Sequence, residues 1–324
     1  MTNIAAGPAQ GRLENFPVSF FAVVMGLGGL TLALHAAGPA LGLGAQPALI
    51  AYLVTAATFA AVVVVYLAKS VRHPRSIAEE WRHPVKLAFF PAISISLLLL
   101  ATATLPRNAA LAEPAWLAGA GLQAVLTVAV VSGWISRRSF QHVQLSPAWF
   151  IPAVGNVVVP VAGVQLGYAE ISWYFMSVGL IFWVVLLTLV INRLVFHDPL
   201  PARLQPTLVI LIAPPAVAYV AWVQLTGEVG AFGRILLNGA YFFALIVAVQ
   251  LPRLVKLSFA MSFWALSFPF AAVTIASLVH ADVTGSGAHR LIGAALLAVL
   301  VTVVLALLLR TGRAIANREI CQPE

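Results

Sequence analysis

Long apolar runs alternate with short polar segments along nearly the whole chain. Ten of these runs are about 20 residues long, which is the length of a helix that crosses a hydrocarbon core roughly 30 Å thick. They cover residues 17–37, 46–68, 84–105, 115–136, 147–168, 171–195, 205–225, 230–250, 257–280 and 288–310. The pattern predicts an all-α membrane protein with ten spans.

Prolines interrupt some of these spans and leave others intact. Pro269, in the middle of the ninth, removes one backbone hydrogen bond and clashes with the carbonyl of Ala265. Six prolines lie well inside a predicted span, all of them in odd-numbered spans: Pro91, Pro152, Pro160, Pro214, Pro215 and Pro269. Neighbouring helices, hydroxyls or water can satisfy the freed backbone groups, whereas lipid cannot. We therefore expect the odd spans to be interior and the even spans to face lipid or another subunit.

The first span has no central proline, but Gly26, Gly28 and Gly29 give it flexibility and allow close approach. Each odd span and the even span after it form one hairpin, and all odd spans run in the same direction. Repeats of two spans are parallel and are related by an axis along the membrane normal, unlike inverted transporter repeats. Five inner helices around one axis would enclose a pore.

Composition supports a membrane protein, since 61% of the residues are hydrophobic and only 9% are charged, against about 25% charged in a soluble domain. The single cysteine, Cys321, excludes an intrachain disulfide and a cysteine metal cluster. The net charge of +8 does not indicate nucleic-acid binding, because that requires basic residues clustered on a soluble face.

The 18 basic residues instead follow the loops. Only Arg107, Arg234 and Arg290 lie on one side of the predicted membrane. The other fifteen lie on the side of the termini: Arg12, Lys69, Arg72, Arg75, Arg82, Lys86, Arg137, Arg138, Arg193, Arg203, Arg253, Lys256, Arg310, Arg313 and Arg318. This positive-inside bias predicts cytoplasmic termini. We expect a cytoplasmic N-terminal segment, 1–16, one membrane domain, 17–311, and a cytoplasmic tail, 312–324.

The predicted interior is neutral. No ionisable residue lies near the centre of a span, which disfavours a proton-driven carrier. Candidate polar lining comes from odd spans: Ser19, Ser94, Ser96, Asn156, Ser258, Ser262, Ser267 and Thr274. Serine and threonine in helices often bond back to their own backbone, which is the simpler interpretation for most of them.

Signatures of an enzyme or a metal site are missing. The Gly-Leu-Gly-Gly of 26–29 follows no strand, so it does not indicate a nucleotide loop. A serine and histidine intramembrane protease is a remote alternative. His280, Asp282 and His289 fall in the last outer loop, where solvated side chains are more expected than a metal site. We predict no cofactor and no enzymatic activity.

Several local patterns then coincide in their order along the chain. They are His83-Pro84-Val85-Lys86 with Phe89-Phe90, Val154-Gly155-Asn156, Ala213-Pro214-Pro215, and Trp264 to Pro269. With them the chain resembles the tellurite-resistance/dicarboxylate transporter family, which includes bacterial TehA-type proteins and the slow anion channel of plant guard cells. The resemblance extends from Phe16-Pro17 to the tenth span.

The resemblance implies five hairpins around a pseudo-fivefold axis, with odd helices lining the pore and even helices outside, in a homotrimer with one pore per subunit. It also implies that Phe268 is the pore gate, beside Pro269 as its hinge. Pore-lining candidates are Phe20, Ser94, Asn156, Pro214, Ser262 and Ser267. The chain has Val24-Met25 where some bacterial relatives carry a proline, and Pro269 where some carry glycine.

The leading hypothesis is a passive anion channel of the bacterial inner membrane. Its partners would be small inorganic or carboxylate anions, membrane lipids and two further copies of the chain. The alternative is a secondary transporter or exporter of C4-dicarboxylates such as malate, or of oxyanions such as tellurite or sulfite. A membrane scaffold without transport is the third class.

Overall fold

The computed structural model describes residues 11–136 and 140–322, and within these ranges the chain is helical without strands. Part of the predicted N-terminal segment, the last two residues of the tail, and Arg137 and Arg138 lie outside the described residues. Nine helical segments in the described part are long and apolar enough to cross a membrane. The predicted all-α membrane fold is confirmed, and the fifth predicted span is the shorter apolar segment Pro147–Gly163.

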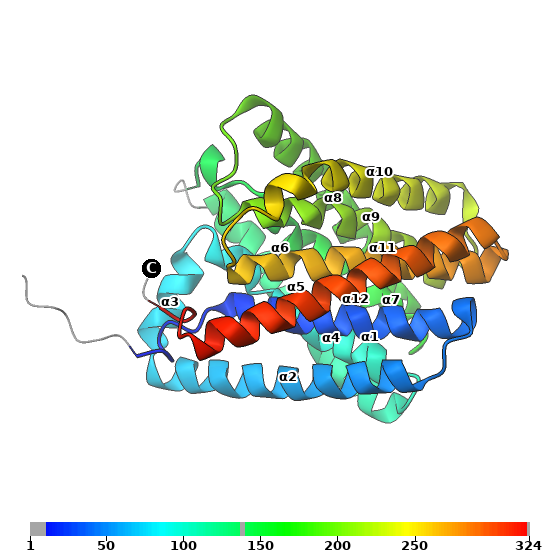
Figure 1. The fold of residues 1–324 in the computed structure, drawn as a ribbon, viewed down its shortest axis with the longest axis horizontal. Helices are drawn as coiled ribbons and strands as arrows, with labels where there is room; N and C mark the ends of the chain where they lie inside the picture. The colour runs from blue at the N-terminus through cyan, green and yellow to red at the C-terminus, as the bar shows by residue number, and fades with distance from the viewer. Residues whose placement is uncertain (1–10, 137–139, 323–324) are drawn as a thin grey trace, which may run out of the picture.

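Twelve α-helices make up the described fold. They are α1 (Phe21–Leu41), α2 (Gln46–Arg72), α3 (Pro74–Arg82), α4 (Ala92–Thr104), α5 (Ala109–Ser136), α6 (Phe150–Val154), α7 (Val159–Gly163), α8 (Ala169–Phe196), α9 (Ala213–Thr226), α10 (Gly230–Leu254), α11 (Ser267–Thr284) and α12 (Gly287–Ala316). Short 3-10 helices cover Val18–Phe20, Lys86–Phe89, His142–Gln144, Pro147–Trp149, Gly155–Val158, Gln205–Ile212 and Met261–Leu266. The long helices lie side by side, with both ends of the described chain at the same end of the bundle (Figure 1).

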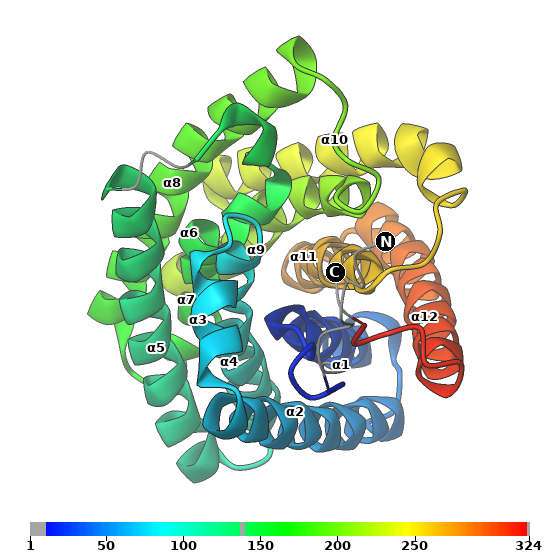
Figure 2. The same cartoon turned by 90° about the vertical axis from the view of Figure 1, so that its left-hand side faces the viewer.

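The odd spans lie inside and the even spans outside. Along their most apolar stretches, the first, third, seventh and ninth spans are 67%, 83%, 78% and 78% buried, whereas the even spans are 17% to 33% buried. Viewed end-on, α2, α5, α8, α10 and α12 surround α1, α4, α6, α7, α9 and α11 (Figure 2). The inner and outer assignment made from the prolines therefore agrees with the burial, while pseudo-fivefold symmetry stays a prediction.

The prolines are accommodated by tightening the backbone just before them. Pro91 cannot donate to the Leu87 carbonyl, but the Phe90 N–H, one residue earlier, donates to it over 3.3 Å. The N–H groups of Val159 and Ala213 likewise donate to the carbonyls that Pro160 and Pro214 leave unpaired, those of Asn156 and Ile210. A 3-10 turn makes this i to i−3 bond. Local geometry thus offsets part of the cost of each proline.

The contrast between odd and even spans holds in their middles but not at their ends. Pro114 lies within the first turns of α5 and Pro252 near the end of α10. The fourth span, predicted over residues 115–136, is part of a longer helix that begins at Ala109 and includes Pro114. A proline near a helix end removes a backbone hydrogen bond close to the loop, where this loss is less costly than in the middle of a helix.

The short helix α3 was not expected from the sequence, and it anchors the start of the first span. Its Glu80 carboxylate lies 3.2 Å from the Lys69 ammonium and accepts hydrogen bonds from the Tyr66 hydroxyl and the Val18 N–H. Lys69 also donates to the Phe16 carbonyl over 2.9 Å. This buried cluster ties α2, α3 and the residues before α1 together.

His280 and His289 are not in a solvated loop, so that expectation was wrong. His280 lies in α11 and is 6% exposed, and His289 lies in α12. Their ring centroids are 4.1 Å apart, and the Tyr219 hydroxyl is 2.8 Å from His280 Nδ1. The loop is shorter than predicted because α11 continues to Thr284. No group of three metal-ligating side chains occurs in the described ranges.

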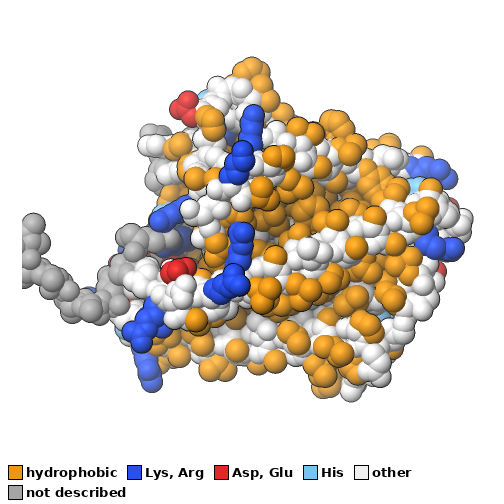
Figure 3. Space-filling model, in the orientation of Figure 1, with side chains coloured by type: hydrophobic (Ala, Val, Ile, Leu, Met, Phe, Trp, Pro, Cys, Tyr) orange, Lys and Arg blue, Asp and Glu red, His pale blue; other side chains and the backbone are white. Residues whose placement is uncertain are grey.

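The surface carries a broad hydrophobic band. On the face shown in Figure 3, hydrophobic side chains cover the middle of the bundle and lysines and arginines lie toward both ends. The outer helices expose large apolar side chains such as Val64, Val125, Val184 and Leu245. Such a contiguous apolar surface is expected of helices that face lipid. The chain is therefore a multi-pass membrane protein.

Candidate functional site

A narrow cavity of about 60 Å³ lies among the inner helices. All five odd spans contribute to its wall. The lining residues are Ala22 and Met25 from the first, Phe89, Ala92 and Ile95 from the third, Phe150, Ile151, Val154, Gly155, Val157 and Val158 from the fifth, Ile210, Ala213, Pro214 and Val217 from the seventh, and Trp264, Ala265, Phe268 and Pro269 from the ninth. The cavity has room for only a few water molecules.

The wall is apolar throughout. Even its one indole has its polar atom engaged elsewhere, since Trp264 Nε1 donates to the Thr311 hydroxyl on α12 over 2.9 Å. A small apolar cavity disfavours hydrated ions, because water leaves narrow apolar passages and an ion then loses its hydration shell. In the conformation seen here, the lining side chains offer no charged group to a solute.

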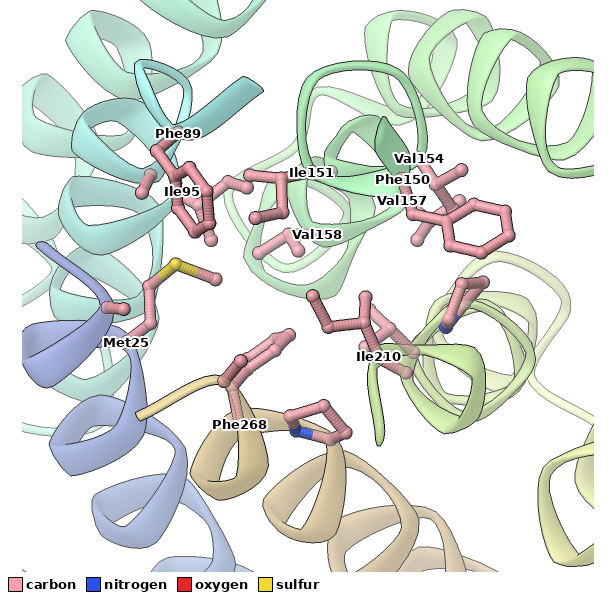
Figure 4. A pocket seen from close by; sticks show the side chains of 18 of the residues that line it. Met25, Phe89, Ile95, Phe150, Ile151, Val154, Val157, Val158, Ile210 and Phe268 are labelled. Atoms are coloured by element: carbon pink, nitrogen blue, oxygen red, sulfur yellow. The ribbon is translucent and has the colours of Figure 1, made fainter. Parts of the chain in front are cut away.

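Phe268 projects into this cavity from the second residue of α11. Its ring extends into the space bounded by Met25, Val158 and Ile210 (Figure 4). Two neighbouring phenylalanines behave differently: Phe263 and Phe270 are each 7% exposed and belong to the packed core. Of the three phenylalanines Phe263, Phe268 and Phe270, Phe268 is the one in the cavity wall.

A glycine on α1 allows this helix to pack closely against α11 beside the Phe268 ring. A Cβ atom placed on Gly29 would lie 2.7 Å from the Cβ of Ala271 and 3.4 Å from Cδ2 of Phe268. Contacts of 2.7 Å between such atoms require the helices to shift. Gly29 thus lets α1 and α11 approach closely at the level of Phe268.

Three of the predicted site residues share the cavity wall, namely Phe268, Pro269 and Pro214. Phe20 is not among the lining residues and stacks on Phe16 with ring centroids 4.2 Å apart. Ser267 donates to the Trp264 carbonyl over 2.7 Å, the self-bonding expected of a helical serine.

The other polar candidates also lie outside the set of lining residues. The Ser262 hydroxyl is buried without a hydrogen-bond partner in the described part of the chain. Ser94 and Asn156 are fully buried and point toward α5: Ser94 donates to Gln123 Oε1 over 2.7 Å, and Asn156 Nδ2 donates to the Thr127 hydroxyl over 3.0 Å.

Sequence reasoning missed the apolar wall and the role of the outer helix. Met25, Ile151 and Ile210 carry no polar signal and were not among the predicted pore-lining residues. Gln123 is a fully buried amide in the middle of an even span, where a lipid-facing residue was expected. A lone glutamine in an otherwise apolar run was the available signal, because buried polar groups in membranes are costly unless paired.

Known proteins resemble this chain over most of its length. Residues 15–312 match the family model of SLAC1, described as voltage-dependent anion channel. The S-type anion channel SLAH3 of Arabidopsis thaliana is 28% identical over 263 residues, which is 80% of this chain and 41% of that protein. The chain thus spans about two fifths of that plant channel.

Two microbial relatives match at nearly full length. An uncharacterized transporter of Methanocaldococcus jannaschii is 26% identical over 292 residues, covering 83% of this chain and 85% of the relative. The tellurite resistance protein TehA homolog of Haemophilus influenzae is 24% identical over 263 residues, or 79% of each chain. The resemblance to TehA-type proteins and plant slow anion channels is confirmed, and the chain belongs to the SLAC1 family of anion channels and transporters.

Proposed function

We propose that the chain forms a passive anion channel of the bacterial inner membrane and that its pore follows the cavity among the inner helices. The observation that carries this proposal is that all five odd spans line one apolar cavity and the Phe268 ring extends into it. The conformation described here is then a closed state, in which an aromatic ring fills a dry constriction.

Opening requires the ring to leave the constriction. Pro269 follows Phe268 directly, and the backbone changes from a 3-10 helix to an α-helix at Ser267. This junction is a suitable hinge, since proline lacks the N–H that would bind the two sides together. A bend here or a rotation of the Phe268 side chain would move the ring aside.

Anion preference in this proposal does not come from a charged pore wall, because the cavity lining contains no ionisable residue. The predicted cytoplasmic end carries most of the arginines and lysines, and a positive mouth raises the local concentration of anions. A neutral wall with a positive entrance passes small anions without binding them tightly.

The test is planar-bilayer recording of the purified protein and its Phe268→Ala variant. Removing the ring is expected to raise anion conductance roughly tenfold or more, the change for a barrier lowered by about 1.4 kcal/mol. Phe270→Ala is the matched control, because Phe270 lies in the core outside the cavity wall, and it should leave conductance near that of the wild type. Phe268→Ala with no more conductance than wild type would refute the gate.

Reversal potentials in a chloride gradient test the sign of the permeant ion. We expect them to lie near the chloride equilibrium potential. A shift to the cation equilibrium potential would overturn the anion pore.

A secondary transporter or exporter of dicarboxylates or oxyanions is the second candidate. It is favoured by the names of two relatives matched over 85% and 79% of their length, one a transporter and one a tellurite resistance protein homolog. Saturable uptake with counterflow of labelled malate in liposomes would support a carrier, whereas flux that stays proportional to concentration supports a channel. Absence of flux in both assays would instead indicate a scaffold.

The proposal includes the arrangement in the membrane. Residues 1–16 and 312–324 would be cytoplasmic and residues 17–311 would form the channel domain. The exposed apolar faces of the even helices would contact lipid and the neighbouring subunits of a homotrimer, each subunit with its own pore. No cofactor is part of the proposal.

A further inference from the structure

Backbone carbonyls pose a problem for an anion path made from broken helices. Between Phe150 and Gly163 the chain passes from α6 through the 3-10 helix Gly155–Val158 into α7. Carbonyl oxygens that leave the regular helical pattern are negative ends of dipoles, and rings of such oxygens are how cation channels hold their ions. An anion path through this segment requires those oxygens to point elsewhere.

The outer helix α5 supplies donors to this segment. Gln123 Nε2 donates to the Pro152 carbonyl oxygen over 3.1 Å. The Thr127 hydroxyl lies between two acceptors, 2.9 Å from the same Pro152 oxygen and 2.7 Å from the Gln123 carbonyl of its own helix. Farther along, Trp116 Nε1 donates to the Val159 carbonyl over 2.9 Å. Two backbone oxygens of the broken span are therefore drawn toward α5, which lies on the outside of the bundle.

The donors are held in place by their own partners. Gln123 Oε1 accepts from the Ser94 hydroxyl on α4 over 2.7 Å, and Gln123 Nε2 lies 3.2 Å from Thr127 Oγ1. Asn156 Nδ2 donates to Thr127 Oγ1 over 3.0 Å and to the Ala153 carbonyl over 2.6 Å. Gln123 is fully buried and Thr127 is 6% exposed, so water does not compete for these bonds.

The same segment turns its apolar side to the cavity. Val154, Val157 and Val158 are lining residues, whereas Pro152 is not in the cavity wall. Gly155 permits this arrangement, because a Cβ there would lie 2.6 Å from Cδ1 of Ile95 and 3.2 Å from Gln123 Nε2. The Pro152 and Val159 carbonyls thus bond to α5, while the side chains of Val154, Val157 and Val158 line the cavity.

We propose that Gln123 and Thr127 are positioning residues for charge selectivity, which act by holding the Pro152 carbonyl toward α5 and away from the anion path. The inference rests on the proposed anion channel and extends it to residues that do not touch the pore. Without these donors, the Pro152 oxygen keeps only the longer contact with Asn156 Nδ2, at 3.5 Å. Water or a cation in the pore could then satisfy the oxygen.

The experiment measures permeability ratios, which a merely structural role would not move. Currents are recorded in sodium chloride gradients with Phe268→Ala as the background, so that the pore is open. Two substitutions are added to this background in turn. Gln123→Met keeps a similar volume but has no donor, and Thr127→Val replaces the hydroxyl by a methyl group. Each should lower the chloride-to-sodium permeability ratio about fivefold, the factor for losing a typical buried hydrogen bond. The permeability ratio of the variant with both substitutions should be lower still.

Controls separate selectivity from folding. Thr188→Val removes a hydroxyl that bonds its own helix, at the Val184 carbonyl on the exposed face of α8, and should keep the parent ratio. Thr127→Ser keeps a hydroxyl at this position, so its permeability ratio should match that of the parent and not that of Thr127→Val. Thr127→Val conserves volume, so it serves as the test if Gln123→Met fails to elute as a folded protein in detergent.

The outcomes distinguish this inference from the proposed function. If the Phe268→Ala background is not anion-selective, the channel proposal fails and this inference fails with it. If that background is anion-selective and folded Gln123→Met and Thr127→Val keep its ratio, only the role of the two donors is refuted. A ratio that falls in both and recovers in Thr127→Ser supports it.

Discussion

At the scale of single residues, the gate region depends on the smallest side chain. Gly29 on α1 faces Ala271 and the ring of Phe268 on α11. A Cβ placed on Gly26 would likewise lie 2.8 Å from the Cβ of Ser267 and 3.0 Å from Cε3 of Trp264. Small residues let membrane helices approach each other, and here the approach brings the gate helix against the first span. The glycines of the first span therefore permit close packing without interrupting α1, which continues from Phe21 to Leu41.

Gly29→Ala is expected to destabilise the protein by about 1–3 kcal/mol, because the added methyl group overlaps Ala271 in a packed interface. A lower melting temperature in detergent would be the measurement. Gly121→Ala on the exposed side of α5 is the control, since a Cβ there meets open space, and it should not lower the melting temperature. Equal melting temperatures for both variants would contradict the close packing inferred at Gly29.

At the scale of elements, proline placement predicted which spans are interior but not how their backbones are built. A proline in the sequence indicates a missing backbone hydrogen bond, and in a membrane the freed carbonyl must be enclosed by protein. The proline does not indicate whether the helix kinks, bulges or tightens into a 3-10 turn. The 3-10 turns before Pro91, Pro160 and Pro214 depend on the neighbours that each inner segment packs against.

Helix α3 provides an element-scale prediction. Glu80→Gln should destabilise the protein by about 3–5 kcal/mol, because it leaves the buried Lys69 ammonium without its charged partner. Glu79→Gln changes the exposed neighbouring carboxylate and should have little effect. Melting temperatures in detergent compare the two.

Removing both charges, with Lys69→Met and Glu80→Gln together, should recover part of the lost stability. A double variant at least as unstable as Glu80→Gln alone would argue against an unpaired charge as the cause.

At the scale of the whole molecule, two independent patterns agree. The arginines and lysines divide fifteen to three between the predicted sides, and together they make up the 18 basic residues of the chain. The helices alternate between buried and exposed along the chain. One missed or extra span would disturb both patterns, so their agreement supports the order of the hairpins.

Reporter fusions test the orientation that follows. Green fluorescent protein at the C-terminus should fluoresce, because that end is predicted to be cytoplasmic. Alkaline phosphatase, which is active outside the cytoplasm, should be inactive there but active when inserted between Gly285 and Ser286, in the loop joining α11 to α12. The opposite pair of readings would reverse the predicted topology.

By itself, the sequence determined the membrane class, the approximate positions of the spans, and the division into inner and outer helices. It also predicted the orientation of the spans in the membrane. These follow from chain-local properties, namely hydrophobic length, charge between spans and the backbone defects of proline. Tertiary structure alone decided which side chains meet. Ser94 and Asn156 turn to Gln123 and Thr127 rather than to the cavity, and Phe268 rather than Phe263 or Phe270 reaches it, because each direction depends on helix rotation and on contacts between distant segments.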